Sequence, residues 1–164
     1  MNDNIPLPSF FDKKGVAKRG TWKKLTNHQI WFEWMRKSLN FNDPEDLYKL
    51  NRNIITNMKG HGLFKNYYHS SPYEFVKALC LDNYEFLPWK FGQTSHTYWD
   101  DLENHKVFAN WLGKELRYTS MEDWYQVSKQ DFKKNGGDGL LQRDYKGSII
   151  RFVRKIFKYE WLEW

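Results

Sequence analysis

A residue pattern that occurs twice, 77 positions apart, constrains this chain more than any other feature. Residues 43–71 read DPEDLYKLNRNIITNMKGHGLFKNYYHSS, and residues 120–148 read SMEDWYQVSKQDFKKNGGDGLLQRDYKGS. The identical positions are an acidic pair, tyrosines, glycines, a leucine and a serine: Glu45/Glu122, Asp46/Asp123, Tyr48/Tyr125, Gly60/Gly137, Gly62/Gly139, Leu63/Leu140, Tyr68/Tyr145 and Ser71/Ser148. Repetition at a fixed period indicates an architecture of repeated units. We therefore predict two repeats, residues 22–91 and 92–164, after an N-terminal segment, residues 1–21.

Apolar residues near the start of each copy recur at helical spacing. They are Ile30, Trp31, Trp34, Met35 and Leu39 in the first copy, and Val107, Phe108, Trp111, Leu112 and Leu116 in the second. Such a stripe predicts a long amphipathic helix, which we expect Asn27 and Asn104, or a neighbouring residue, to cap.

Shorter helices are expected to follow, with Ser71, Ser120, Ser128 and Ser148 as N-caps. Residues 139–141 are expected to re-enter the core directly after a glycine turn. Pro6 and Pro8 argue against a helix in the first 21 residues, which we expect to lie outside the repeat core. No stretch alternates with a period of two. The predicted fold is all-α: two tandem repeats of about four short helices each, with a basic N-terminal arm.

Residues with catalytic potential are mostly not shared by the two copies. The unshared ones are His61, His69 and Cys80, which stand opposite Asp138, Lys146 and Phe157. A duplicated catalytic or metal site would have kept them, and no phosphate loop or dinucleotide fingerprint is present. We predict a protein that is not an enzyme, with no catalytic residues, no metal and no cofactor. The recurring His28 and His105 are interpreted as capping or packing residues, whereas a pocket lined by His61, His69 and a carboxylate would favour an enzyme.

Positive charge is concentrated in two places. The chain carries a formal charge of +6, and residues 1–26 alone hold six basic and two acidic residues. In the second copy, residues 126–158 hold nine basic and three acidic residues. Arg151, Arg154, Lys155 and Lys158 follow i, i+3, i+4, i+7 spacing and are predicted to share a helix face. The helix start at residues 146–148 would add free backbone N–H groups, which favour phosphate.

The residues Tyr145, Lys146, Gly147 and Ser148 resemble the aromatic-Gly-Ser element of the helix-turn-helix repeats that accompany homing endonucleases. That resemblance implies DNA binding without catalysis, although the first copy has Ser70 in place of the glycine. The wider pattern of EDWY, NGG-x-GLL, Gly-Ser and paired tryptophans is similar to a tandem helical repeat of uncharacterised proteins. This second resemblance implies no particular activity.

The predicted function is a non-catalytic nucleic-acid-binding module, with DNA slightly preferred over RNA. The predicted contact residues are Lys13, Lys14, Lys18, Arg19, Lys133, Lys134, Arg143, Lys146, Arg151, Arg154, Lys155 and Lys158. The alternative is an adaptor that binds a protein partner, or joins a larger complex, through exposed aromatics. The less periodic aromatics are Tyr67, Tyr68, Tyr73, Tyr145 and Trp164. The salt dependence of binding distinguishes these two functions, because phosphate contacts weaken steeply as the salt concentration rises.

Few features of the sequence indicate the cellular compartment or an association with a membrane. The single cysteine excludes an internal disulfide and favours a reducing compartment. No apolar run approaches the roughly 18–20 residues of a membrane span, and the N-terminus lacks the layout of a signal peptide. We expect an intracellular protein without a membrane partner, and leave nucleus, organelle and cytoplasm open.

Overall fold

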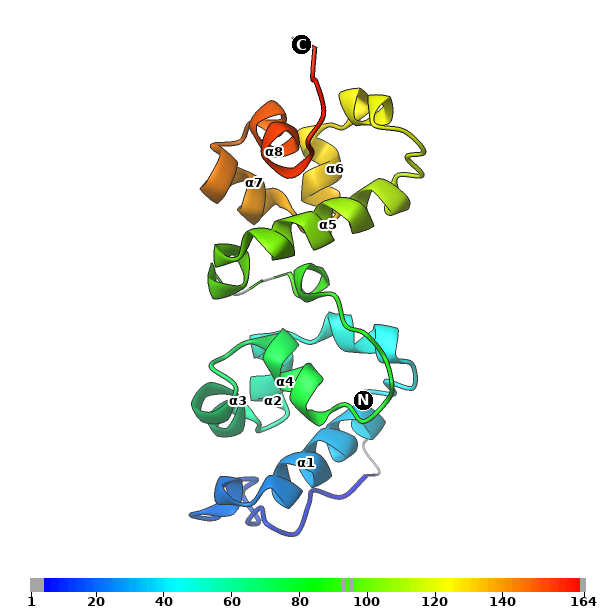
Figure 1. Ribbon diagram of the computed structural model, residues 1–164. Coiled ribbons are helices and arrows are strands. Elements are labelled where there is room, and N and C mark those ends of the chain that lie inside the picture. Colours follow the sequence, from blue (N-terminus) through cyan, green and yellow to red (C-terminus); the bar gives the residue numbers. More distant parts are fainter. Residues whose placement is uncertain (1–4, 93, 95, 163–164) are drawn as a thin grey trace. The chain divides into compact units, whose positions relative to one another are not determined.

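The computed structural model describes residues 5–92, 94 and 96–162, and these residues form helices and connecting turns (Figure 1). Within those ranges no strand occurs, and β pairing is limited to an isolated bridge between Phe11 and Ala17. The predicted all-α class is confirmed. The chain divides into two compact units, residues 1–93 and 94–164, which we describe separately. No helix in the described part of the chain is long and apolar enough to cross a membrane.

The order of helices in the second unit matches that in the first. Unit 1 contains η1 (Thr21–Lys23), α1 (Leu25–Ser38), η2 (Pro44–Lys49), α2 (Arg52–Asn57), α3 (His61–Tyr67), α4 (Pro72–Leu79) and η3 (Pro88–Phe91). Unit 2 contains η4 (His96–Asp100), α5 (Leu102–Glu115), η5 (Glu122–Gln126), α6 (Lys129–Lys134), α7 (Asp138–Tyr145) and α8 (Ile149–Ile156). Apart from η3, each element of unit 1 has a counterpart of the same type in unit 2. In each unit the long helix lies along one side and the shorter helices pack against it (Figure 1).

Three of the four predicted serine caps form, whereas Ser120 does not cap η5, which follows Met121 and has no side-chain cap. Ser71, Ser128 and Ser148 each accept a hydrogen bond from the backbone N–H three residues later, and Ser128 forms a full capping box with Asp131. These caps satisfy N–H groups that the first turn of a helix leaves without an intrahelical partner.

Asn27 and Asn104 do not cap the long helices: α1 has no side-chain cap, and α5 is capped by Asp101, whose carboxylate accepts from the N–H of Glu103. These helices begin at Leu25 and Leu102, so Asn27 and Asn104 lie inside the first turn. Their side-chain amides donate backwards, to the carbonyl of Thr21 (2.8 Å) and of Tyr98 (2.6 Å). The asparagines therefore fasten the preceding 3₁₀ turn to the helix instead of capping the helix.

Helices α3 and α7 replace the non-helical segments that the glycines suggested. Each begins directly after a glycine, Gly60 or Gly137. A Cβ atom at Gly60 would lie 2.4 Å from the Trp31 ring, and one at Gly137 would lie 2.3 Å from the Phe108 ring. Gly136 makes the left-handed turn that ends α6, with φ of 78°, as the sequence predicts. Gly60 and Gly137 permit close packing of the next helix start against the long helix.

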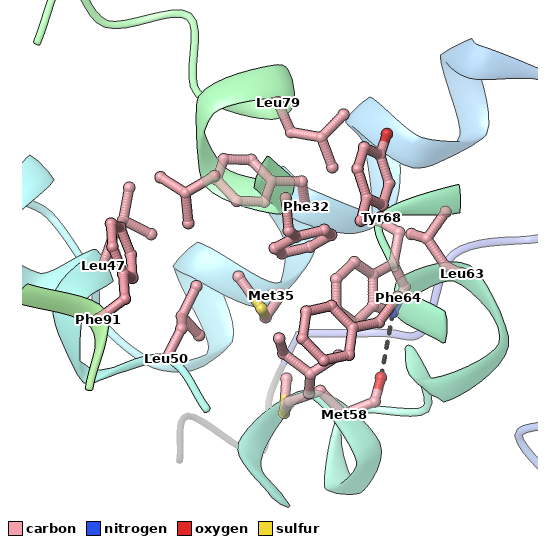
Figure 2. Close-up of a cluster of buried hydrophobic side chains, with 14 of the residues drawn as sticks. Phe32, Met35, Leu47, Leu50, Met58, Leu63, Phe64, Tyr68, Leu79 and Phe91 are labelled. Atoms are coloured by element: carbon pink, nitrogen blue, oxygen red, sulfur yellow. Dashed lines mark hydrogen bonds between the residues drawn. The ribbon is translucent and has the colours of Figure 1, made fainter. Parts of the chain in front are cut away.

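The core of each unit surrounds one buried phenylalanine. In unit 1 this is Phe75, which has Trp31, Phe32, Phe64 and Tyr68 around it at centroid distances of 5.2–5.8 Å, all edge-on. Figure 2 shows the surrounding cluster, and its dashed line marks the hydrogen bond to the carbonyl of Met58, which the Trp31 indole N–H donates over 3.1 Å.

In unit 2, the residue 77 positions later, Phe152, has the same place. Its ring neighbours are Phe108, Trp124, Phe132 and Tyr145, at 5.0–6.4 Å. Trp124 is tilted against Phe152 and the other three rings meet it edge-on. Aromatic pairs of this kind add stability beyond the area they bury.

The N-terminal segment is packed onto unit 1 and does not lie outside the core as expected. Phe11 is 7% exposed and belongs to the hydrophobic core, and the ring of Phe10 contacts Trp22 edge-on at 5.5 Å. The Asp12 carboxylate accepts hydrogen bonds from the backbone N–H groups of Lys14 and Val16, both at 2.8 Å, and forms the turn that follows. Removing this segment would open the core, so it is not dispensable for the fold.

One pair of core positions differs in a coupled way between the units. Unit 2 places Trp124 where unit 1 has Leu47, and Gly113 where unit 1 has Arg36. A Cβ atom at Gly113 would lie 3.2 Å from the Trp124 ring, so the missing side chain makes room for the indole. In unit 1 the guanidinium of Arg36 binds Asp82 at 3.0 Å.

Replacing either packing glycine by alanine is expected to destabilise its unit. The new methyl group in Gly60→Ala or Gly137→Ala must displace a buried aromatic ring, at a cost of about 1–3 kcal/mol. Chemical denaturation of the purified variants measures this loss. Gly139→Ala is the matched control, because no atom lies within 4 Å of its added Cβ and alanine favours the helix by about 1 kcal/mol. Equal stabilities for Gly137→Ala and Gly139→Ala would contradict the packing role.

Candidate nucleic-acid interface

The four predicted N-terminal contacts lie on the surface of unit 1. Lys13 and Lys14 are exposed in the turn that Asp12 holds, and Arg19 is exposed before η1. Lys18 is also exposed, but its ammonium group donates to the carbonyl of Ser9 at 3.1 Å. These residues are thus held by a folded segment, and they do not form a free arm within the described residues.

Six of the predicted contacts in unit 2 come from neighbouring elements. We call them the basic surface: Lys133, Lys134, Lys146, Arg151, Arg154 and Lys155, all of which are exposed. Helices α6 and α8 pack together through Phe132 and Phe152, whose ring centroids are 5.0 Å apart. Each of these phenylalanines is adjacent in sequence to a residue of the basic surface. The buried side of α8 consists of Phe152, Val153 and Ile156, which leaves its cationic residues on the solvent side.

The cationic groups of the basic surface lack internal counter-charges. None of the six forms an ion pair with a carboxylate of the described residues. The corresponding residues of unit 1, 77 positions earlier, are Thr56, Asn57, His69, Glu74, Lys77 and Ala78, and they are exposed as well. Two units with the same order of helices therefore present very different charge at equivalent positions.

Arg143 is held by its own unit and differs from the other predicted contacts. Its guanidinium group binds Asp144 at 2.9 Å and Asp100 at 3.1 Å, and donates to the carbonyl of Trp99 at 2.7 Å. The arginine joins α7 to η4, so its charge is compensated before any partner arrives. A role in holding unit 2 together is the simpler explanation for this residue.

Lys158 does not share the face of α8 that its spacing predicts. The helix ends at Ile156, and Phe157 adopts extended backbone angles, φ −105° and ψ 130°. The extended conformation lets the Phe157 ring pack on Trp124, at a centroid distance of 4.8 Å. Lys158 is exposed, but it lies in the segment that leaves the helix.

The turn before α8 offers fewer free N–H groups than the sequence suggested. Lys146 and Gly147 both have left-handed backbone angles, with φ of 53° and 69°. The N–H of Gly147 donates to the carbonyl of Leu141 at 2.9 Å, and that of Ser148 donates to the carbonyl of Tyr145 at 3.0 Å. Phosphate contacts here would therefore depend mainly on the lysine and arginine side chains.

The two recurring histidines serve the fold. His28 and His105 are buried, and each accepts or donates at both ring nitrogens. Nε2 lies 2.8 Å from the carbonyl of Trp22 in unit 1 and 2.7 Å from that of Trp99 in unit 2. A carbonyl can only accept, so Nε2 carries the proton in the neutral ring. Nδ1 then accepts from a tyrosine hydroxyl, Tyr68 at 2.8 Å or Tyr145 at 2.7 Å.

Other groups with catalytic potential are not gathered into a site. His61 and His69 are exposed on the surface of unit 1. The Cys80 thiol is partly buried, which raises its pKa, and it donates to Asp82 at 3.4 Å. Within the described ranges, no group of three histidine, cysteine, aspartate or glutamate residues could hold a metal ion. That the protein is not an enzyme stays a prediction.

The aromatics proposed for an adaptor are mostly not available at the surface. Tyr68 and Tyr145 are buried against the histidines, and Tyr73 is half-buried. Tyr67 is 42% exposed, and Trp164 lies outside the described residues. A broad aromatic contact surface is therefore absent from this predicted set.

Comparison of the chain with protein-family models, curated proteins and solved structures found no match. The basic surface is therefore interpreted from its geometry and charge alone.

Lys129 is one exposed residue that the predicted set omits. It lies four residues before Lys133 in α6, so the two share a helix face. The charge count of residues 126–158 included it, and helical spacing on α6 was the signal that would have identified it.

Removing the tyrosine hydroxyl from a histidine–tyrosine pair is expected to destabilise its unit. Tyr68→Phe leaves Nδ1 of the buried His28 without a donor, at a cost of about 1–3 kcal/mol. Urea denaturation at neutral pH measures the loss. The control is Tyr67→Phe, because Tyr67 is exposed and contacts the His28 ring at 4.8 Å only through its own ring. A loss as large in the control would refute the importance of the hydroxyl.

Alkaline pH is expected to weaken unit 2 through Tyr145. Burial, and then the neighbouring Asp144, raise the pKa of Tyr145 to about 12, whereas an unfolded tyrosine has a pKa of about 10. The contribution of this residue to stability is thus complete below pH about 10 and is lost as pH rises towards about 12. Urea midpoints between pH 8 and pH 11 should fall more steeply in the wild type than in Tyr145→Phe. Parallel curves would exclude Tyr145 as the titrating group.

Proposed function

We propose that the protein binds nucleic acid through the basic surface of unit 2, without catalysing a reaction. The observation that supports this proposal most strongly is the group of six exposed cationic side chains on α6, on α8 and before α8. They lack ion-pair partners among the described residues, and their counterparts in unit 1 carry almost no net charge. Cations needed only for solubility would have no reason to gather in one unit.

Phosphate contacts are the binding mode that such a surface favours. Exposed lysine and arginine side chains neutralise phosphates and release condensed counterions, which makes the affinity fall linearly with salt on logarithmic scales. The arginines on α8 add bidentate geometry for phosphate oxygens. The N-terminal Lys13, Lys14 and Arg19 offer a second set of contacts on unit 1. The resemblance to helix-turn-helix repeats favours DNA over RNA, and nothing in the basic surface requires base-specific contacts.

An exchange of residues between the units tests the proposal. The loss variant K133T/K134N/K146H/R151E/R154K/K155A gives unit 2 the residues that unit 1 has at the equivalent positions. The charge of the surface falls from +6 to 0, while the shared helical frame is kept. Fluorescence anisotropy with labelled duplex DNA, single-stranded DNA and RNA, at about 50 and about 200 mM salt, measures binding. With about six phosphate contacts, wild-type affinity should fall about 10³-fold across this range. The variant should bind at least tenfold more weakly at low salt, with a shallower salt dependence.

The reciprocal variant tests whether the same cationic residues support binding when they are placed on unit 1. T56K/N57K/H69K/E74R/K77R/A78K builds the basic surface on unit 1, and in the background of the loss variant it should restore binding. A second control, K37A/R52A/K65A, removes three exposed cations of unit 1 and should leave affinity within about threefold. No binding by the wild type to any of the three probes at low salt would overturn the proposal. Binding that is insensitive to salt would favour a protein partner instead.

A further inference from the structure

A short extended segment closes each unit in the same way. After the last helix, the chain reads Tyr-Glu-Phe-Leu at residues 84–87 and Tyr-Glu-Trp-Leu at residues 159–162. We call each of these segments the strap of its unit. The strap docks on the 3₁₀ helix that carries the shared Glu-Asp-x-Tyr sequence, η2 in unit 1 and η5 in unit 2. We call the glutamate and tyrosine of that helix the acceptor pair: Glu45 with Tyr48, and Glu122 with Tyr125.

Two polar contacts fix the ends of the strap. The hydroxyl of the first strap residue, Tyr84 or Tyr159, donates to the carboxylate of Glu45 or Glu122. The backbone N–H of the last strap residue donates to the tyrosine hydroxyl of the acceptor pair. That distance is 2.8 Å from Leu87 to Tyr48 and 2.6 Å from Leu162 to Tyr125. The acceptor pair therefore recognises both a side chain and the extended backbone.

An apolar contact lies between the two polar ones. The third strap residue, Phe86 or Trp161, is 8–9% exposed. Its ring packs edge-on against the acceptor tyrosine, 5.8 Å from Tyr48 in unit 1 and 5.3 Å from Tyr125 in unit 2. It also packs on the first strap tyrosine, at 4.7 Å and 4.9 Å. A buried aromatic anchor between two directional hydrogen bonds is a common arrangement in peptide recognition.

The docking geometry does not depend on how the strap is connected. The last helices correspond at an offset of 77, as in Phe75 and Phe152, whereas the straps correspond at 75, as in Tyr84 and Tyr159. The intervening connection is residues 80–83 in unit 1 and residues 157–158 in unit 2. Two connections of different length and composition deliver the same three contacts. The acceptor pair and the strap sequence, and not the connection, therefore determine the docking.

We infer that the Glu-Asp-x-Tyr helix is a binding site for an extended Tyr-x-aromatic-Leu segment, and that the acceptor pair of unit 2 can bind such a segment from a second copy of this chain. The occupant seen in both units defines the chemistry of the ligand: a phenol hydroxyl, an aromatic anchor and a backbone N–H three residues after the phenol. The inference is independent of nucleic-acid binding, because neither the acceptor pair nor the strap belongs to the basic surface.

The intact chain fills its own site. A tethered strap acts at an effective concentration in the millimolar range for short connections, so a free peptide competes poorly with it. A peptide is therefore expected to bind only after the chain's own strap has lost its contacts. Tyr159→Phe with Trp161→Ala removes the phenol and the aromatic anchor from unit 2 and leaves the acceptor pair unchanged.

The test uses the full-length Y159F/W161A variant and two labelled peptides, Lys-Tyr-Glu-Trp-Leu and Asn-Tyr-Glu-Phe-Leu, which copy residues 158–162 and 83–87. Fluorescence anisotropy should show saturable binding of both peptides, at least tenfold tighter than to the wild type. Adding E122Q/Y125F should weaken binding at least tenfold, and a peptide of scrambled order is the control. Absence of binding to a variant that circular dichroism shows to be folded would overturn the inference, as would binding that survives E122Q/Y125F.

Hydrogen exchange keeps the inference testable if Y159F/W161A does not fold. In full-length Tyr125→Phe, the amide of Leu162 loses its acceptor and should exchange at least tenfold faster than in the wild type. The amide of Leu87 has the same contact in unit 1 and should be unchanged. In the wild type, mixing labelled and unlabelled chains under mild urea should transfer straps between copies, which cross-linking at the strap detects. An unaltered Leu162 exchange rate in Tyr125→Phe would contradict docking through the tyrosine hydroxyl.

Discussion

Edge-on packing of aromatic rings around one buried phenylalanine governs the architecture of each unit. Phe75 and Phe152 belong to the last helix, yet their ring neighbours come from the long helix and the intervening helices. A unit of this size has little interior, and large rings supply buried area from few residues. Because ring edges must meet ring faces, the neighbouring helices have little freedom to shift. The close approach of Gly60 and Gly137 to the long helix follows from this requirement.

Hydrogen bonds made by polar side chains also join the segments of each unit. The histidine of the long helix joins a backbone carbonyl of the preceding turn to the tyrosine at the end of α3 or α7, so one side chain ties three segments. The Glu-Asp-x-Tyr helix does the same for the chain that leaves the last helix. Histidines and paired acidic residues, which are often catalytic in other proteins, therefore form hydrogen bonds within the fold here. The cationic side chains of α6 and α8, by contrast, form no ion pair with a carboxylate of the described residues.

Much of this could be read from the sequence, because helical spacing and serine caps are local properties. The all-α class and the caps Ser71, Ser128 and Ser148 needed no tertiary information. Helices α3 and α7 were missed because glycine has two uses, and only the ring of Trp31 or Phe108 shows which one applies. The displaced Lys158 and the compensated Arg143 share one cause: Phe157 and Asp100 act on them through tertiary contacts that spacing does not reveal. The basic surface itself was predictable because exposed charge follows helix periodicity.

The exchange of Leu47 and Arg36 for Trp124 and Gly113 constrains how such units diverge. A Cβ atom at Gly113 would lie 3.2 Å from the Trp124 ring, so any side chain there would require the indole to shift. The glycine and the tryptophan of unit 2 are therefore coupled, and a change at one position alters the packing of the other. Coupled interior positions of this kind limit which core residues one unit can take from the other, whereas exposed positions are not limited in this way.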